Sequence, residues 1–154
     1  MQDVAHVEAA IVTAGAGTEG GSFDNEERKI FELINKERRK YGLHPLDWSA
    51  DLADMARSYS KQMARENFFS HYDRRGNSVA DRARAMKIKR WRRIGENLFM
   101  CDGYEKFTNL AIKGWMNSSS HRENILEIDY NATGIGVARS SNGAIYITQV
   151  FLQD

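Results

Sequence analysis

The chain has 154 residues, the length of one globular domain, and its 42% apolar residues are enough to fill a single core. Lys and Arg total 22 against 21 Asp and Glu, so the net charge of +1 gives no overall field that would attract nucleic acid or an acidic membrane. Cys101 is the only cysteine, which excludes an intramolecular disulfide and a cysteine-built zinc site, and no apolar stretch reaches the roughly 18 residues of a membrane span.

The N-terminal segment has the composition of a tail. Residues 1–10 lack the basic and apolar blocks of a signal peptide, so no signal peptide is expected in this chain. Residues 14–22 contain four glycines together with Thr, Glu and Ala, a composition typical of flexible linkers. We therefore expect a flexible tail or linker over residues 1–22 and one folded domain over residues 23–154.

Two long helices are predicted after this tail. Asp24 and Glu27 have the spacing of a capping box, and apolar residues then recur at helical spacing until Gly42. Ser49 can cap a second helix that runs to about Asn67. One face of this second helix is apolar and consists of Leu52, Met55, Ala56, Tyr59 and Met63.

Three shorter helices follow, separated by polar segments. Residues 68–77 end the second helix and form a loop, after which Ser78 opens a helix that extends to about Met86. Apolar spacing predicts another helix over residues 107–115. Ser120 and Glu123 repeat the capping-box spacing, which places His121 in the first turn of the last helix.

The end of the chain changes from helical to strand periodicity. Residues 133–138 and 144–151 are predicted to be strands, and Asn142-Gly143 between them indicates a two-residue hairpin turn. Both faces of the second strand are largely apolar, so the sheet is expected to be covered on both sides. Helices around one sheet indicate an α+β layered sandwich.

Three side chains have the types that a divalent metal or a proton-transfer site needs: His71, Glu96 and His121. The positive end of a helix dipole beside His121 disfavours the imidazolium and leaves a ring nitrogen able to act as ligand or base. Their spacing of about 25 residues matches no short metal motif. Spacing alone therefore leaves open a structural role, in which backbone groups satisfy all three.

A second candidate is the basic segment that surrounds Trp91. Basic and aromatic side chains together can hold phosphates and stack on rings, although such runs are commonly solvated loops. The cluster consists of Lys87, Lys89, Arg90, Arg92 and Arg93.

Five motifs occur in order along the chain: residues 69–71 (Phe-Ser-His), 95–98 (Gly-Glu-Asn-Leu), 115–126 (Trp-Met-Asn-Ser with His-Arg-Glu-Asn-Ile-Leu), 134–137 (Gly-Ile-Gly-Val) and 146–151 (Tyr-Ile-Thr-Gln-Val-Phe). Together they resemble the bacterial branch of the CAP superfamily, the SCP-like domains of cysteine-rich secretory and pathogenesis-related proteins, over residues 25–151. The resemblance implies a three-layer α-β-α sandwich with a small antiparallel sheet between helices. It also implies a cleft lined by His and Glu and, usually, an extracellular or cell-envelope location.

The sequence departs from the animal and plant members at two cleft positions. Those members carry two His and two Glu, whereas the corresponding positions here resemble Ser118 and Tyr146. As in bacterial members, the second imidazole is then expected from His121. A metal site identical to that of the animal proteins is not expected, and zinc or another divalent cation stays an open possibility at His71, Glu96 and His121.

Three functions follow as hypotheses for a domain expected to be a monomer without a nucleic-acid partner. The first is a cleft that binds a small polar or lipid-like ligand, with Arg122 and Tyr146 as further contacts. The second is a hydrolase in which Glu96 acts as general base beside His71 and His121, although the sequence offers no convincing nucleophile. The third is binding of an anionic envelope polymer through the basic segment, with contacts from Lys89, Arg90, Arg92 and Arg93.

Overall fold

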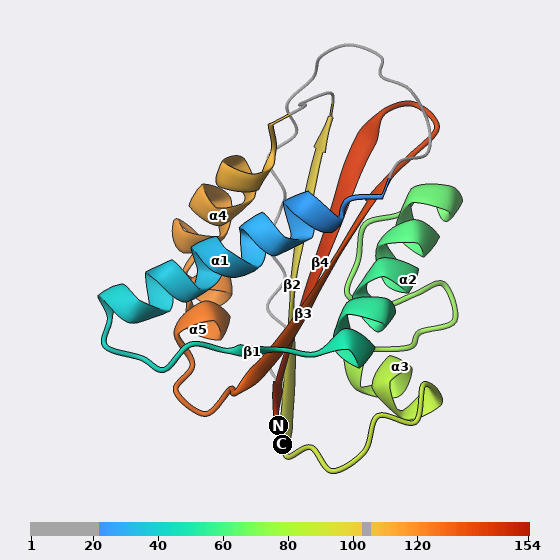
Figure 1. The fold of residues 1–154 in the computed structure, drawn as a ribbon. Coiled ribbons are helices and arrows are strands. Elements are labelled where there is room, and N and C mark those ends of the chain that lie inside the picture. The colour runs from blue at the N-terminus through green and yellow to red at the C-terminus, as the bar shows by residue number, and fades with distance from the viewer. Residues whose placement is uncertain (1–21, 103–105) are drawn as a thin grey trace.

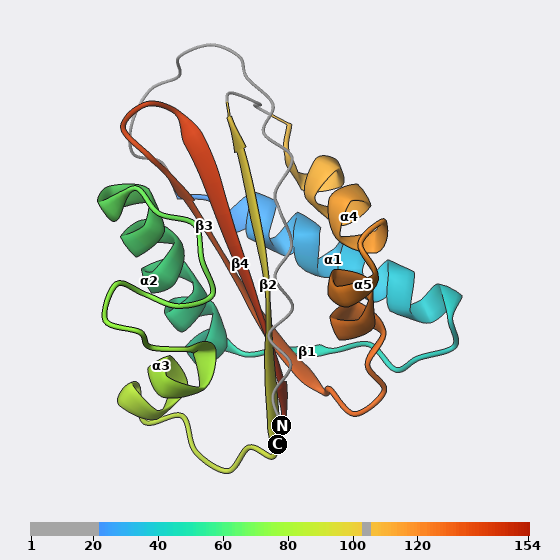
Figure 2. The same ribbon diagram turned by 180° about the vertical axis from the view of Figure 1, so that it is seen from behind.

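Three layers surround one sheet in the computed structural model, which describes residues 22–102 and 106–154 (Figure 1). Helices α1 (Asp24–Lys40), α4 (Thr108–Met116) and α5 (Ser119–Leu126) cover one face of the sheet. Helices α2 (Ala50–Glu66) and α3 (Val79–Ala85) cover the other, as the view from behind also shows (Figure 2). The expected α-β-α sandwich is therefore confirmed. The tail predicted over residues 1–22 lies outside the described residues, apart from Ser22.

The sheet consists of β1 (Asp47–Trp48), β2 (Arg93–Asp102), β3 (Ala132–Arg139) and β4 (Ala144–Gln153), in the order β1-β3-β4-β2. Strands β2, β3 and β4 pair antiparallel, but β1 runs parallel to β3. The expected antiparallel sheet is thus confirmed for β2, β3 and β4, and the two-residue strand β1 adds a parallel pair at one edge. The segment between α1 and α2 passes along β3, where the backbone N–H groups of Asp47 and Ser49 donate to Asn131 and Thr133.

Strand β4 shows why both faces of the sheet are buried. Its residues Ile145, Ile147 and Phe151 belong to the apolar cluster beneath α1, α4 and α5. On the other face, Tyr146 and Val150 belong to clusters formed with α2 and α3. The predicted alternation along this strand, with both faces covered, is confirmed.

The helix ends agree with local sequence signals only in part. Ser49 caps α2 by accepting from the Leu52 N–H, and Ser78 forms a capping box with Asp81 at α3. At α1, however, Phe23 is the N-cap, and the predicted capping box is absent because Glu27 turns into the protein. Helix α5 is not capped by Ser120 as expected, because its N-cap is Ser118, which makes no side-chain capping bond.

Two further differences concern strands and turns. Strand β2 is not among the elements predicted from sequence, because a run such as Leu98–Cys101 that is buried on both faces lacks the alternation of a half-exposed strand. The β3–β4 turn spans residues 140–143 rather than two residues. Within it the Gly143 N–H donates to the Ser140 carbonyl, and Gly143 has a φ of +91°, which favours glycine.

Candidate functional site

Four side chains from four different segments meet at the β2 end of the strand order. They come from the loop after α2, from α3, from β2 and from the first turn of α5. We refer to them as the cleft cluster, after the cleft expected from the sequence: His71, Arg82, Glu96 and His121. His71 retains 8% of its surface exposed, and Glu96 and His121 each retain 7%. The structure thus brings together the three residues singled out from the sequence and adds Arg82.

Glu96 is held from both sides. Its Oε1 lies 2.8 Å from Nδ1 of His71, and its Oε2 lies 2.8 Å from Nη1 of Arg82, an ion pair whose geometry is not that of a hydrogen bond. Both carboxylate oxygens are therefore occupied by protein groups. This contact fixes the orientation of the His71 ring, because one ring nitrogen is committed to the carboxylate.

Arg82 was not identified from the sequence, although it connects most of the cluster. Its Nη2 donates to the His71 carbonyl over 3.2 Å, and its guanidinium carbon lies 3.4 Å from the centroid of the Tyr59 ring. A planar guanidinium suits this combination of stacking and carboxylate pairing. The only sequence signal was a pair of arginines, Arg82 and Arg84, in a short helix, and that signal does not distinguish the inward Arg from the solvated one.

The other face of β2 holds α5 in place and so positions His121. Asn97 donates from Nδ2 to the His121 carbonyl over 3.0 Å, and Asn124 donates to Asn97 Oδ1 over 2.9 Å. A Cβ on Gly95 would lie 2.4 Å from the Tyr130 hydroxyl, so only glycine allows this close approach. Asn97 and Asn124 therefore join β2 to α5, and the motif Gly-Glu-Asn supplies one residue of the cluster between two packing residues.

His121 is one of the cluster residues with a buried polar atom that lacks a hydrogen bond; the others are Arg82 (Nε and Nη1) and Glu96 (Oε2), which face each other as an ion pair. Burial, and secondarily the electrostatic influence of His71, lower the pKa of its imidazole to about 4, so the ring is neutral near pH 7. Its Nδ1 is buried and has no hydrogen-bond partner among the described residues. Leaving a buried polar atom unpaired costs about 1–3 kcal/mol, so this position favours an external hydrogen-bonding group.

The metal expectation meets only part of its requirements. Within residues 22–102 and 106–154, no group of three or more His, Cys, Asp or Glu side chains is arranged to hold a metal ion. Glu96 uses both oxygens on His71 and Arg82, so it would act as an outer partner rather than as a ligand. The protein would supply at most the two imidazoles, which is an incomplete set for a structural zinc site.

The residues predicted as further ligand contacts lie outside the cleft cluster. Arg122 is exposed and donates to the Met116 carbonyl. Tyr146 is buried beside Phe69, with ring centroids 6.5 Å apart. It lies four residues along β4 from Val150, the partner of Glu96, which is about 13 Å in a strand. The structure therefore places neither Arg122 nor Tyr146 among the residues that contact Glu96.

The basic segment is only partly available for an anionic partner. Lys87, Lys89, Arg90 and Arg92 are exposed. Arg93 instead forms ion pairs with Glu127 at 3.0 Å and with Asp129 at 3.4 Å. One member of the predicted basic set is thus neutralised by acidic neighbours, which weakens the case for a continuous cationic surface.

The buried neutral state of His121 predicts a specific loss of stability in acid. Because its pKa falls from 6.5 to about 4 on folding, the unfolded chain binds a proton between these values that the folded protein does not. Stability should therefore fall as the pH drops from 6.5 to 4, with His121 contributing roughly 2–3 kcal/mol. Urea unfolding at several pH values should show a shallower decline for His121→Asn, whereas His44→Asn, at an exposed position, should follow the wild type. Parallel curves for His121→Asn and wild type would contradict the assignment.

Comparison with protein families supports the resemblance noted in the sequence. The model of the cysteine-rich secretory protein family, CAP, matches residues 31–151. Two Bacillus subtilis proteins are similar to the chain: the uncharacterized membrane protein YlbC, 34% identical over 129 residues, and the uncharacterized protein YkwD, 36% identical over 126 residues. Each alignment covers 82% of this chain, but only 34% of YlbC and 46% of YkwD, so the chain spans less than half the length of these relatives.

Solved structures with the same fold include an extracellular protein with an SCP domain from Bacillus anthracis, with a TM-score of 0.73 and 29% identity. That alignment covers 85% of this chain and 41% of the other. An outer surface protein of Borrelia burgdorferi has a TM-score of 0.76 at 20% identity, with 86% of this chain and 95% of the other covered. At that identity the second likeness shows the fold alone.

Proposed function

Because this chain belongs to the cysteine-rich secretory protein (CAP) family, we propose that it is a binding domain whose cleft cluster takes a small polar ligand. The observation that carries this proposal is the buried Nδ1 of His121, which has no partner in the described part of the chain. The ligand supplies the missing hydrogen bond. The contacts of Glu96 with His71 and Arg82 hold the surrounding groups in fixed positions, so little ordering accompanies binding.

The chemistry of the cluster favours a polar ligand over a lipid-like one. The neutral imidazole of His121 offers one donor and one acceptor, depending on its tautomer. A carboxylate and a guanidinium lie close to it, and a hydrocarbon ligand would offer these charged groups no polar partner. A small molecule with adjacent donor and acceptor groups meets these requirements.

The contacts of Glu96 support binding rather than hydrolysis. A general base must be within reach of the proton that it removes, and here both carboxylate oxygens are held by His71 and Arg82. Ser70, which precedes His71 in the chain, accepts a hydrogen bond from the Tyr72 N–H through its Oγ. These contacts leave neither a free carboxylate nor an activated serine nucleophile at these positions.

A divalent cation is the second candidate occupant, supported by the unpartnered Nδ1 of His121. His71 would join by exchanging one of its present contacts, and Glu96 would orient the ring from outside. Solvent or ligand would complete the coordination, because the two imidazoles alone do not. Such a cation would polarise the bound ligand.

An extracellular or cell-envelope location is part of the proposal. It is supported by the likeness to the Bacillus anthracis protein, which is described as extracellular. In the described segments, no helix has both the length and the apolar character needed to cross a bilayer. The anionic-polymer function predicted from the basic segment has no comparable support, since Arg93 is already paired.

Imidazole NMR tests ligand binding directly. We expect long-range proton–nitrogen spectra, recorded while a library of small polar compounds is added, to show shifts of His121 and His71 and none of His44, which is exposed outside the cluster. His121→Gln should abolish the response of His71 while the thermal unfolding curve stays cooperative. A response confined to His44, or an unchanged response in His121→Gln, would contradict the proposal.

Zinc titration separates the two occupants. Calorimetry of the 154-residue protein with zinc chloride should show one site in the wild type and in His44→Gln if a cation is the occupant, and no site in His121→Gln. Absence of zinc binding in the wild type would remove the cation and leave the polar ligand. Zinc binding that survives in His121→Gln would place the metal elsewhere.

A further inference from the structure

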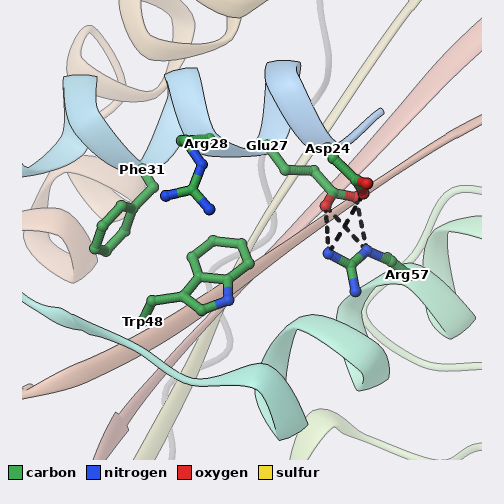
Figure 3. Close-up of a pocket in the computed structure, with 6 residues that line it drawn as sticks. All are labelled: Asp24, Glu27, Arg28, Phe31, Trp48 and Arg57. Atoms are coloured by element: carbon green, nitrogen blue, oxygen red, sulfur yellow. Dashed lines mark hydrogen bonds and ion pairs between the residues drawn. The ribbon is translucent and has the colours of Figure 1, made fainter. Parts of the chain in front are cut away.

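A separate cavity lies between α1, β1 and α2, at the β1 end of the strand order and so at the opposite edge of the sheet from the cleft cluster (Figure 3). Its volume of about 330 Å³ is within the range of about 300–1,000 Å³ that is typical of small-ligand sites. We refer to it as the α1–β1 cavity, and it is lined by Asp24, Glu27, Arg28, Phe31, Trp48 and Arg57.

One wall of the α1–β1 cavity is aromatic and open to solvent. Phe31 and Trp48 meet edge to face, with ring centroids 5.4 Å apart and an interplanar angle of 78°. Trp48 keeps 37% of its surface exposed, although it is among the largest apolar side chains of the protein. Its indole N–H makes no hydrogen bond with the described residues. The wall therefore offers a flat apolar face and a donor at its edge.

The two acidic side chains of the cavity lie beside one of its two arginines, Arg57, which also pairs with Asp54 at 3.1 Å. Arg57 donates to Glu27 with Nε–O distances of 2.9 and 3.0 Å and an Nη2–Oε2 distance of 2.6 Å. Asp24, which is largely exposed, lies 3.9 Å from the same Nη2. These groups are joined by the dashed contacts in Figure 3 and leave Asp24 able to accept from a ligand.

Arg28 is the arginine of the cavity that takes no part in these ion pairs. It is exposed and makes no hydrogen bond, ion pair or ring contact with the part of the chain that the structure describes. Its guanidinium lies on the side of α1 that faces Trp48 (Figure 3). The charged lining residues sum to zero, but both carboxylates lie at Arg57, so Arg28 stands beside the aromatic wall with no ion-pair partner among the described residues. A ring that carries one carboxylate matches this position.

We propose that the α1–β1 cavity binds a carboxylate-bearing sugar ring, such as a uronic acid unit of an acidic polysaccharide. The C–H face of the ring stacks on Trp48 and Phe31, and its carboxylate pairs with the fork of Arg28. Ring hydroxyls donate to Asp24 and accept from the indole N–H of Trp48. An aromatic acid is less well matched, because the apolar surface is limited to one wall and the other four lining residues are charged.

Calorimetry of the full chain with a galacturonic acid trisaccharide tests the proposal. The wild type should bind this probe, and the neutral galactose trisaccharide of the same linkage should bind at least about tenfold more weakly because it lacks the partner of Arg28. Arg28→Gln should weaken binding of the acidic probe by a similar factor. Trp48→Ala should abolish binding, since it removes the stacking surface.

Matched variants distinguish this cavity from general charge and from the cleft cluster. Lys29→Gln removes the same charge from an exposed neighbour, and Tyr41→Ala removes an exposed aromatic ring elsewhere on the surface. Both should bind the acidic trisaccharide within about twofold of wild type. The same is expected of His121→Ala, whose failure to bind would instead assign the probe to the cleft cluster.

Four results would overturn the proposal: equal binding of the neutral trisaccharide, an equal loss in Lys29→Gln, tighter binding of a glycerol phosphate oligomer than of the uronic acid probe, or no binding at millimolar concentrations. Because Arg28 and Trp48 are exposed, their replacement should leave the thermal unfolding curve near that of wild type. The failure of this proposal would leave the function proposed for the cleft cluster untouched.

Discussion

Replacing Gly136 with alanine is expected to lower the free energy of unfolding by roughly 3 kcal/mol or more, or to prevent folding. An added Cβ would lie 2.0 Å from the backbone N of Arg57 and 2.3 Å from the carbonyl carbon of Ala56. Both atoms belong to the backbone of α2, so the clash cannot be relieved by rotating a side chain. The helix would have to move away from β3 and lose the close packing along its apolar face.

Gly114 provides the matched control, since it also lies within a regular element. A Cβ there would meet only the Phe99 ring, at 3.6 Å, which is an ordinary contact. Gly114→Ala should therefore stabilise the protein by about 0.5–1 kcal/mol, because alanine favours helix. Urea denaturation of both variants measures the difference. A Gly136→Ala protein within about 1 kcal/mol of wild type would show that α2 lies farther from the sheet than the structure places it.

Glu96→Ala should lower the free energy of unfolding by about 3–5 kcal/mol, the range for breaking a buried ion pair from one side. Arg82, whose side chain is 10% exposed, would keep its charge without the carboxylate 2.8 Å away. His71 would lose the partner of its Nδ1 at the same time. Most of the loss comes from the charge left buried, rather than from the strength of the pair itself.

The double variant Glu96→Ala with Arg82→Met separates these contributions. Replacing Arg82 removes the buried charge that Glu96→Ala leaves without a partner. This should recover part of the lost stability, so the effects of the two changes should not be additive. Glu66→Ala is the control, because that carboxylate forms only surface ion pairs with Arg65 and Arg74, and its loss should change stability by less than about 1 kcal/mol. Additive effects in the double variant would mean that Arg82 and Glu96 are not coupled.

The local signals in the sequence succeeded where neighbouring residues decide the outcome. Ser49 caps α2 and Ser78 caps α3 because a side-chain oxygen two or three positions before a free N–H needs no distant partner. The same pattern failed at Asp24 and Glu27. There Arg57 and the Val137 N–H, 30 and 110 residues along the chain from Glu27, offer that carboxylate a better set of partners.

The candidate site could be found only partly from the sequence. His71, Glu96 and His121 were identified through their motifs, and the structure brings them together at the β2 edge. Arg82 was missed, and Arg122 and Tyr146 were named but lie outside the cluster. Nothing in a local pattern distinguishes an Arg that turns toward a buried carboxylate from one that turns toward water.

The sequence by itself determined the family, the helices, the strands β3 and β4, and three residues of the cluster, because periodicity, capping and short motifs act over a few residues. The tertiary structure alone decided the parallel pairing of β1 and the contacts that Glu96 makes with His71 and Arg82. It also decided which groups lack a partner among the described residues, namely Nδ1 of His121 and the guanidinium of Arg28. Each of these depends on which groups remain without partners after distant segments have packed, and that outcome is a property of the whole fold rather than of any stretch of chain.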